Sequence, residues 1–230
     1  MSDFAASSVF FGLFVTLVSY FIGLEIKKKT KLALMNPSLI ATALVIALLS
    51  CLDIPYEAYH QSAKLISSLL TPATICLAVP LYEQLSLLKK HRNAIFAGII
   101  SGVITSLVCV LTLSLLFRLD HASYVTLLPK SITTAIGMSV SEALGGYVSI
   151  TVAVILITGI LGNVIAEHVC RLFRITDSVA RGIAIGSSSH AIGTAKAMEL
   201  GQIEGAMSSL SIVISGIFTV AGASLFSLFL

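Results

Sequence analysis

The feature that most restricts the fold is a series of apolar runs, each long enough to cross a lipid bilayer. They recur at about 4–26, 32–52, 61–88, 93–117, 147–170 and 205–230. A membrane-spanning helix needs about 20 predominantly apolar residues, so runs of this length indicate membrane helices. Charged residues make up only 11% of the 230-residue chain, against about 25% in a soluble domain. The sequence therefore predicts an all-α polytopic membrane protein.

The first run is expected to stay in the protein as a membrane helix. The stretch from Phe4 to Leu24 is longer than the apolar core of a secretory signal peptide, and no basic residue precedes it. The four cysteines show no CxxC motif and no metal-ligand spacing, and they lie in or beside apolar runs: Cys51, Cys76, Cys109 and Cys170. We interpret them as small hydrophobic residues and expect neither a metal nor a cofactor.

Basic residues cluster in short loops, and these clusters predict the topology. Under the positive-inside rule the loops 27–31 and 89–92 lie in the cytoplasm, which leaves the N-terminus outside. A single crossing by 122–146 would then bring the later arginines to the outside. If 122–146 instead enters and returns as a re-entrant hairpin, ten of the 14 Lys and Arg residues are cytoplasmic. Nucleic-acid binding is not expected, because the basic residues are spread over these loops.

The same charge pattern predicts a second re-entrant hairpin at 176–202, which enters from the cytoplasmic side. The last run then leaves the C-terminus outside. The units 122–170 and 176–230 would each be a hairpin plus a helix in opposite orientations, an inverted repeat of the kind that builds many transporters. We expect residues 118–230 to form the transport core. Residues 1–117 are expected to form a scaffold of four membrane helices with a homodimer surface.

Sequence similarity between the two hairpins favours the repeat. A shift of 60 residues places Lys130 opposite His190. It also aligns identical residues, namely Ile132 with Ile192, Thr134 with Thr194, Ala135 with Ala195, Met138 with Met198 and Gly145 with Gly205. The alternative is a chance match between two membrane stretches of similar composition.

Both stretches interrupt apolar sequence, and non-helical backbone at membrane depth is tolerated only where it is buried in protein or lines a cavity. Ser131 or Thr133 can cap a helix that follows Pro129. Two helix N-termini that meet offer free amides and positive dipole ends to a carboxylate or phosphate. We predict two broken helices that meet at the bilayer midplane around a small anion. The candidate binding residues are Lys130, Ser131, Thr133, Thr134, Ser189, His190, Gly193 and Thr194.

Three ionisable residues each allow two interpretations. Lys130 at membrane depth indicates function, but a lysine there can also snorkel to the outer surface. His190 either binds the substrate or couples protons, or it is a hydrogen-bonded core histidine. Glu142 is a second candidate for coupling, although a position toward the outer end of the hairpin also suits a solvated role. An enzyme is not expected, because the Ser-His pair lacks a GxSxG motif and an orienting acid.

Several motifs resemble those of the LrgB/CidB family of antiholin-like membrane proteins. The matching segments are 54–59, 70–74, 79–82, 128–134, 145–146, 180–182, 189–196 and 204–206. They cover nearly the whole chain, and the blocks Pro-Lys-Ser and Ser-His…Gly-Thr-Ala are the most specific. Two residues depart from the family pattern. Ala135 stands where a Pro often follows the paired threonines, which affects the rigidity of the tip of the first predicted hairpin. Lys196 stands where Arg is usual.

The resemblance implies a multi-pass protein of the inner (cytoplasmic) membrane. Related plastid proteins carry glycolate and glycerate, and bacterial members are associated with pyruvate, so it implies transport of small monocarboxylates. We therefore expect a transporter with elevator-type alternating access around Lys130 and His190. The family name implies an alternative, an antiholin-like regulator of murein hydrolase export and cell lysis. Such a regulator would act with a small holin-like membrane partner of the LrgA/CidA type.

Overall fold

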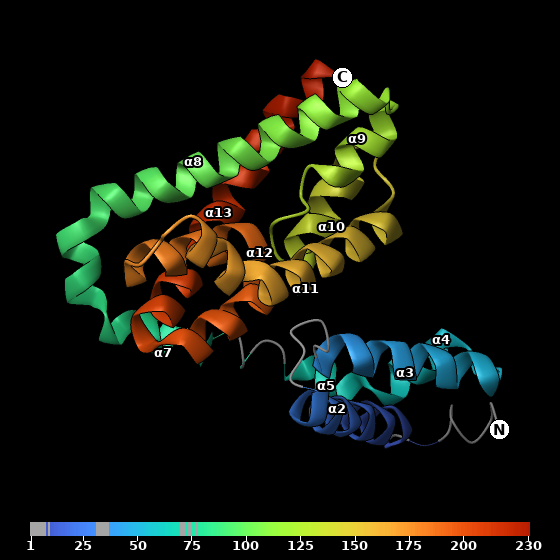
Figure 1. Ribbon diagram of the computed structural model, residues 1–230. Coiled ribbons are helices and arrows are strands. Elements are labelled where there is room, and N and C mark those ends of the chain that lie inside the picture. Colours follow the sequence, from blue (N-terminus) through green and yellow to red (C-terminus); the bar gives the residue numbers. More distant parts are fainter. Residues whose placement is uncertain (1–7, 9, 31–36, 70–71, 73–74, 77) are drawn as a thin grey trace. The chain divides into compact units, whose positions relative to one another are not determined.

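The computed structural model of the chain describes residues 8, 10–30, 37–69, 72, 75–76 and 78–230. Over these residues the secondary structure is helical, without a strand (Figure 1). The chain divides into two compact units, Met1–Cys76 and Leu77–Leu230, and each has its own packing.

The first unit joins its helices through close backbone contacts and hydroxyl bonds. It contains α2 (Phe11–Thr30), α3 (Pro37–Cys51), α4 (Tyr56–Ser62) and α5 (Lys64–Ser68). α2 packs along α3 and against α4. The Gly12 amide donates to Ser62 Oγ at 2.9 Å, and the hydroxyl oxygens of Thr16 and Tyr59 are 2.8 Å apart. Gly12 allows this approach, because a Cβ there would lie 2.6 Å from Ser62 Oγ.

The second unit contains the long apolar helices. Its helices are α7 (Ala78–Glu83), α8 (Leu85–Phe117), α9 (His121–Leu127), α10 (Thr134–Ala143), α11 (Val148–Leu172), α12 (Ser178–Leu200) and α13 (Gln202–Phe226), and a short 3₁₀ turn follows at Ser227–Phe229. α8 bends at His91, and Figure 1 shows the long straight part beyond this bend. Three segments are long and apolar enough to cross a bilayer: Lys89–Phe117, Val148–Leu172 and Gln202–Phe229.

These three long helices alternate in direction. α8 and α13 run parallel, since Ile95 early in α8 shares a buried cluster with Met207 early in α13. At their other ends, Leu107 of α8 packs in a cluster with Ala223 of α13. α11 begins beside α9, which follows the end of α8, so α11 runs back the opposite way.

α9 and α10 form an antiparallel pair joined by the non-helical residues 128–133. A Cβ on Gly137 of α10 would lie 3.5 Å from the Pro129 carbonyl oxygen, so the chain has turned back on itself. The Thr151 hydroxyl of α11 donates to the Thr126 carbonyl at 3.0 Å and fastens α9 to α11. The pair therefore leaves one end of the unit and returns to the same end.

α12 reverses direction at His190, whose φ of 41° and ψ of −140° are not helical. A continuous helix advances about 12 Å over eight residues. A Cβ on Gly193 would nevertheless lie 3.1 Å from Ile185 Cγ2 and 3.3 Å from the Ile185 carbonyl oxygen. The two halves, α12a (178–189) and α12b (191–200), are therefore antiparallel.

Both halves of α12 pack on α13. A Cβ on Gly182 of α12a would lie 2.6 Å from the Glu204 carbonyl oxygen, and the hydroxyl oxygens of Thr194 in α12b and Ser208 are 2.7 Å apart. Glu204 lies at the start of α13, so α12 begins and ends at one end of the unit. That end is opposite the one from which α9 and α10 extend, because α11 separates the two.

Two glycines near the middle of α11 make room for the reversal of α12. A Cβ on Gly159 would lie 2.7 Å from Cε1 of the His190 ring, and a Cβ on Gly162 would overlap the Ser189 side chain. The reversal of α12 is therefore packed at mid-length of α11, in a place that larger residues would fill.

The expected runs at 93–117, 147–170 and 205–230 correspond to α8, α11 and α13. The expected run at 61–88 is instead divided among the end of α4, α5, α7 and the start of α8. Residues 4–7 of the first run, 32–36 of the second and Lys31 of the first basic loop lie outside the described residues. The functional division at 117 stays a prediction, since the compact units divide at 76.

Gly162→Ala is expected to destabilise the protein by about 1–3 kcal/mol, the usual cost of overpacking, because the new methyl group overlaps Ser189. Adding Ser189→Gly removes that overlap and should restore most of the loss, whereas Ser189→Ala keeps its Cβ and should not. Thermal unfolding in detergent, followed by circular dichroism, ranks the stability of these variants. Gly216→Ala is the control, because its nearest neighbour would be 3.4 Å away. A Gly162→Ala variant as stable as the natural protein would contradict this packing.

Candidate functional site

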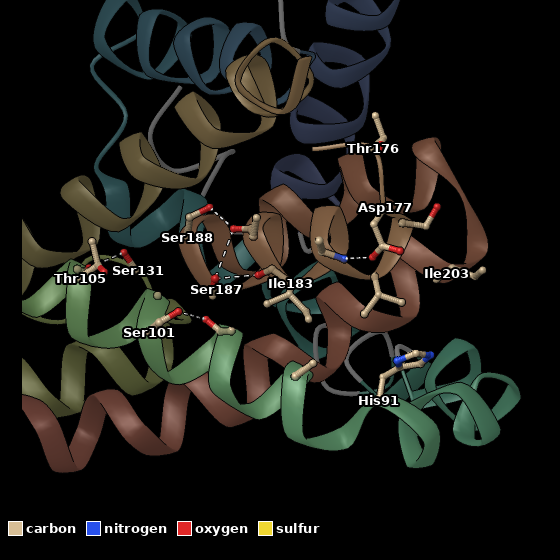
Figure 2. A pocket seen from close by; sticks show the side chains of 18 of the residues that line it. His91, Ser101, Thr105, Ser131, Thr176, Asp177, Ile183, Ser187, Ser188 and Ile203 are labelled. Atoms are coloured by element: carbon tan, nitrogen blue, oxygen red, sulfur yellow. Dashed lines mark hydrogen bonds between the residues drawn. The ribbon is translucent and has the colours of Figure 1, made fainter. Parts of the chain in front are cut away.

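A cavity of about 1110 Å³ lies in the second unit between α8, α12a and residues 128–133. Small and hydroxyl-bearing residues dominate its wall, among them Gly98, Ser101, Gly102, Thr105 and Ser106 of α8 and Ser187 and Ser188 of α12a. Figure 2 shows Thr105 and Ser131 toward one end of this cavity and His91, Asp177 and Ile203 toward the other. The cavity is wide enough for a small hydrated solute.

Lys130 is the one lysine or arginine in the wall of this cavity. Its Nζ donates to Ser131 Oγ at 3.0 Å, and Ser131 Oγ lies 3.2 Å from Ser106 Oγ on α8. Among the described residues no ion pair joins Lys130 to a carboxylate. A cation held by hydroxyls, without an acidic partner, is suited to bind an anion from the cavity.

Lys130 also reaches a second cavity of about 530 Å³ on the other side of α12a. Ala184, Ser188 and Lys130 line both cavities, and Ser189 lines the second. The hydroxyl oxygens of Ser188 and Ser189 are 3.0 Å apart. The structure therefore brings Lys130, from the first interruption, beside the serines that precede the second.

Both interruptions lie near the middle of the long helices. Ser131 contacts Ser106, which lies near the middle of the straight part of α8. His190 packs on Gly159, near the middle of α11. If the long helices cross a bilayer, the two interruptions lie near its midplane.

His190 is 3% exposed and lines neither cavity. Its Nε2 donates to the Ile155 carbonyl of α11 at 3.0 Å, and since a carbonyl only accepts, this nitrogen carries the hydrogen. The Thr194 hydroxyl donates to the His190 carbonyl at 2.9 Å, and Gly193 packs on Ile185. These contacts give His190, Gly193 and Thr194 a role in shaping the reversal, and their part in binding stays a prediction.

The remaining candidates lie beside the cavity or away from it. Thr133 is at the N-cap position of α10, but its side chain makes no capping bond. Thr133 and Thr134 are half-buried and line neither cavity. Glu142 is exposed near the other end of α10 and also lines neither. Of the predicted binding residues, Lys130, Ser131 and Ser189 are thus the ones in a cavity wall.

Polar groups fix the opposite end of the cavity. Asp177 Oδ1 accepts from the Ala180 amide at 2.9 Å and caps the start of α12a. Arg181, one turn later, forms an ion pair at 2.7 Å with Glu204 of α13, whose side chain is 5% exposed. Because α12a is held at this end, its serine-bearing end is directed along α8 toward Lys130.

The wall residues on α8 and α12a are absent from the set predicted from the sequence. Small residues in an apolar run such as 93–117 usually allow close helix packing, and they did not by themselves indicate a cavity. Their spacing contained the missing signal: Gly98, Ser101, Gly102, Thr105, Ser106 and Cys109 recur at helical intervals of three and four and form one stripe. Such a stripe fits close packing and a cavity wall equally well, and here it does both, since a Cβ on Gly102 would lie 3.0 Å from Ser187 Oγ.

Metal ligation is not a feature of the described part of the chain, where no three His, Cys, Asp or Glu side chains gather.

Residues 16–229 match the model of the LrgB-like family. The chain belongs to this family. Holin-like protein CidB of Staphylococcus epidermidis, found in two strains, is 38% identical over 208 residues, which is 90% of each chain. The Bacillus subtilis (strain 168) protein named Uncharacterized protein YwbG is 33% identical over 211 residues, 92% of this chain and 94% of that one. No solved structure matches the chain. The family resemblance of the sequence motifs is confirmed, and with three long apolar helices this LrgB-like chain is a multi-pass membrane protein.

Cys109 lines the same cavity as Lys130, so the reactivity of its thiol should depend on the charge of Lys130. With the other three cysteines replaced by Ala, we expect Cys109 to react faster with an anionic methanethiosulfonate than with a cationic one. In Lys130→Met the rate of the anionic reagent should fall about fivefold and that of the cationic reagent should rise about fivefold, so that their ratio falls about 25-fold, since a nearby unit charge contributes about 1 kcal/mol to each rate in a wet site. Lys196→Met is the control, because Lys196 lines neither cavity. An unchanged ratio in Lys130→Met would contradict the proximity of the two side chains.

Proposed function

We propose that this LrgB-like protein is a transporter of small organic anions, with pyruvate, glycolate and glycerate as the expected class of monocarboxylate. The observation that supports it most is Lys130, which lies at the end of a large cavity beside two interrupted helices and pairs with no carboxylate in the described part of the chain. Burying a lysine in a membrane protein is costly, and such residues generally serve a substrate or ion pathway. No enzymatic activity is part of the proposal.

In this proposal the pair α9–α10 and the pair α12a–α12b are re-entrant hairpins that enter the bilayer from opposite sides. Their support is that the two pairs begin and end at opposite ends of α11. Each is followed by a long apolar helix, α11 or α13. The units 122–170 and 176–230 then form an inverted repeat, the usual build of a carrier with a site at the midplane.

The substrate carboxylate would bind between Lys130 Nζ and the serine hydroxyls of the wall. The hydroxyl oxygens of Ser131 and Ser106 are within hydrogen-bonding distance of one another, and Ser188 lines the same cavity from α12a. The N-terminus of α10 follows directly at Thr134, and its dipole favours a negative charge there. The hydroxyls on both walls can also donate hydrogen bonds to the hydroxyl or keto group of a short acid.

The described conformation would give the site access from one side. The cavity reaches from Lys130 to His91 and Asp177, beside the basic residues 89–92 and 171–181, which the positive-inside rule assigns to the cytoplasm. Toward the opposite end, buried apolar residues of α8, α9 and α13 pack together, and the Tyr124 hydroxyl donates to the Phe226 carbonyl at 2.9 Å. The N-terminus and C-terminus would then face outside the inner membrane.

An elevator-type movement would open the other side. The main cavity lies between α8, which belongs to the expected scaffold, and α12a with residues 128–133, which belong to the expected core. Gly98 and Gly102 let α12a approach α8 with small side chains between them, so that one surface can move along the other. Residues 1–117 would also provide the homodimer surface, and His190 or Glu142 would couple transport to protons.

A second candidate function comes from the relatives, because the matching staphylococcal protein is named holin-like. On this view the chain is an antiholin-like regulator of murein hydrolase export and lysis, which acts with a small LrgA/CidA-type membrane partner. The two functions predict different effects of Lys130, since a regulator that conducts no anion has no need of a charged cavity.

Lys130→Ala is expected to lower kcat/KM for carboxylate uptake by a factor of about 10–100, the loss of one charge-assisted hydrogen bond. The measurement is uptake of radiolabelled pyruvate, glycolate and glycerate into proteoliposomes at two pH values. Lys196→Ala is the matched control, a lysine of α12b outside both cavities.

If the natural protein shows saturable uptake and Lys130→Ala leaves it unchanged, the proposed binding site at Lys130 is wrong. Absence of saturable uptake, with the same lysis phenotype in the natural protein and in Lys130→Ala, would favour the regulator over the transporter.

A further inference from the structure

A third cavity, of about 460 Å³, lies where α11 ends and α12a begins, and arginines line it. Arg171 and Arg174 come from the end of α11, and Arg181 comes from α12a. α11 ends in a tight turn in which Arg174 has a φ of 54° and the Ile175 amide donates to the Cys170 carbonyl at 2.8 Å. This turn brings Arg174 and Ile175 into the cavity wall.

The three arginines are only partly neutralised. Arg171 lies 3.1 Å from Glu167, and Arg181 lies 2.7 Å from Glu204. Arg181 Nε is buried without a hydrogen-bond partner, and no ion pair among the described residues includes Arg174. The pocket therefore keeps positive charge and N–H donors, and guanidinium groups match the geometry of a phosphate.

The cavity of about 530 Å³ on the far side of α12a continues directly from the arginine pocket, and Cys170 and Ile175 line both. Its wall is apolar from there along α11 and polar at Lys130, Ser188 and Ser189. It follows α11 past Val169, Ile165 and Leu161, whose side chains are 38%, 47% and 50% exposed. Large aliphatic side chains exposed along a membrane helix form a surface for lipid chains, so a cationic pocket here opens into an apolar groove.

We propose that an anionic phospholipid binds at this place, with its phosphate among Arg171, Arg174 and Arg181 and one acyl chain in the groove along α11. The arginines follow the end of a membrane-spanning helix, where headgroups lie, and basic pockets between helices on the cytoplasmic side recognise such headgroups. A free phosphate would fill the arginine pocket alone and would leave the groove unused. The lipid site does not depend on the proposed transport function.

Native mass spectrometry tests this with protein in non-ionic detergent, titrated with dioleoylphosphatidylglycerol, dioleoylphosphatidylcholine or sodium phosphate. We expect the anionic lipid to bind about tenfold more tightly than the zwitterionic one, because several arginines face its phosphate. Sodium phosphate should not displace it. Arg174→Gln should weaken binding of the anionic lipid about fivefold, the contribution of one arginine near a headgroup.

Arg118→Gln is the matched control, because Arg118 also ends a helix with a positive φ, 53°, and lines none of the three cavities. Thermal unfolding of both variants checks that each is folded, and Arg171→Gln serves as a second pocket variant. Equal affinity for the two lipids, or unchanged affinity in both pocket variants, would overturn the proposal. Displacement of the lipid by sodium phosphate would overturn it too, in favour of a site for soluble anions.

Discussion

Backbone amides and carbonyls that leave a helix inside a bilayer have to find their partners within the protein, and α11 makes hydrogen bonds to the chain beside both interruptions. The Thr151 hydroxyl donates to the Thr126 carbonyl at 3.0 Å, just before the first. The side-chain amide of Asn163 donates from Nδ2 to the Ile192 carbonyl at 2.9 Å, just after the second interruption. The Ile155 carbonyl accepts from the His190 ring. One helix thus stabilises two non-helical segments, and its glycines leave space for them.

The same arrangement accounts for the chemistry of the main cavity. The Thr151 hydroxyl of α11 holds the chain just before the first interruption, which presents Lys130 and Ser131 to the cavity. The serines that precede the second interruption line the same cavity. α8 completes the wall with a stripe of small residues, so hydroxyls rather than carboxylates surround the ammonium group. On the far side of α12a the second cavity begins at Lys130, Ser188 and Ser189, becomes apolar along α11 and ends beside Arg171, Arg174 and Arg181. The two neighbouring cavities therefore share a polar end and differ in the rest of their walls.

Hydropathy was sufficient to predict α8, α11 and α13, because the length of a membrane helix is encoded in a short-range sequence pattern. The polar motifs at 128–138 and 189–198 located both interruptions, whereas the re-entrant topology inferred from loop charge stays a prediction. Side-chain direction was not predictable in this way. His190 aligns with Lys130 when the sequence is shifted by 60 residues, yet its ring packs against Gly159 of α11 and donates to the Ile155 carbonyl. The serines of α12a and the stripe of α8 enter the cavity through tertiary packing, which no local pattern encodes.

The central claim is that the first interruption and the serines that precede the second line one shared cavity, and cross-linking in native membranes tests it most directly. In a chain without its natural cysteines, Lys130→Cys with Ser188→Cys should be joined by a short flexible bis-methanethiosulfonate, which forms a disulfide with each thiol, since both residues line the same two cavities. Ser106→Cys with Ser131→Cys is the positive reference, because the two hydroxyl oxygens are 3.2 Å apart. The account predicts cross-linking of both pairs. Cross-linking of the reference pair alone would contradict it.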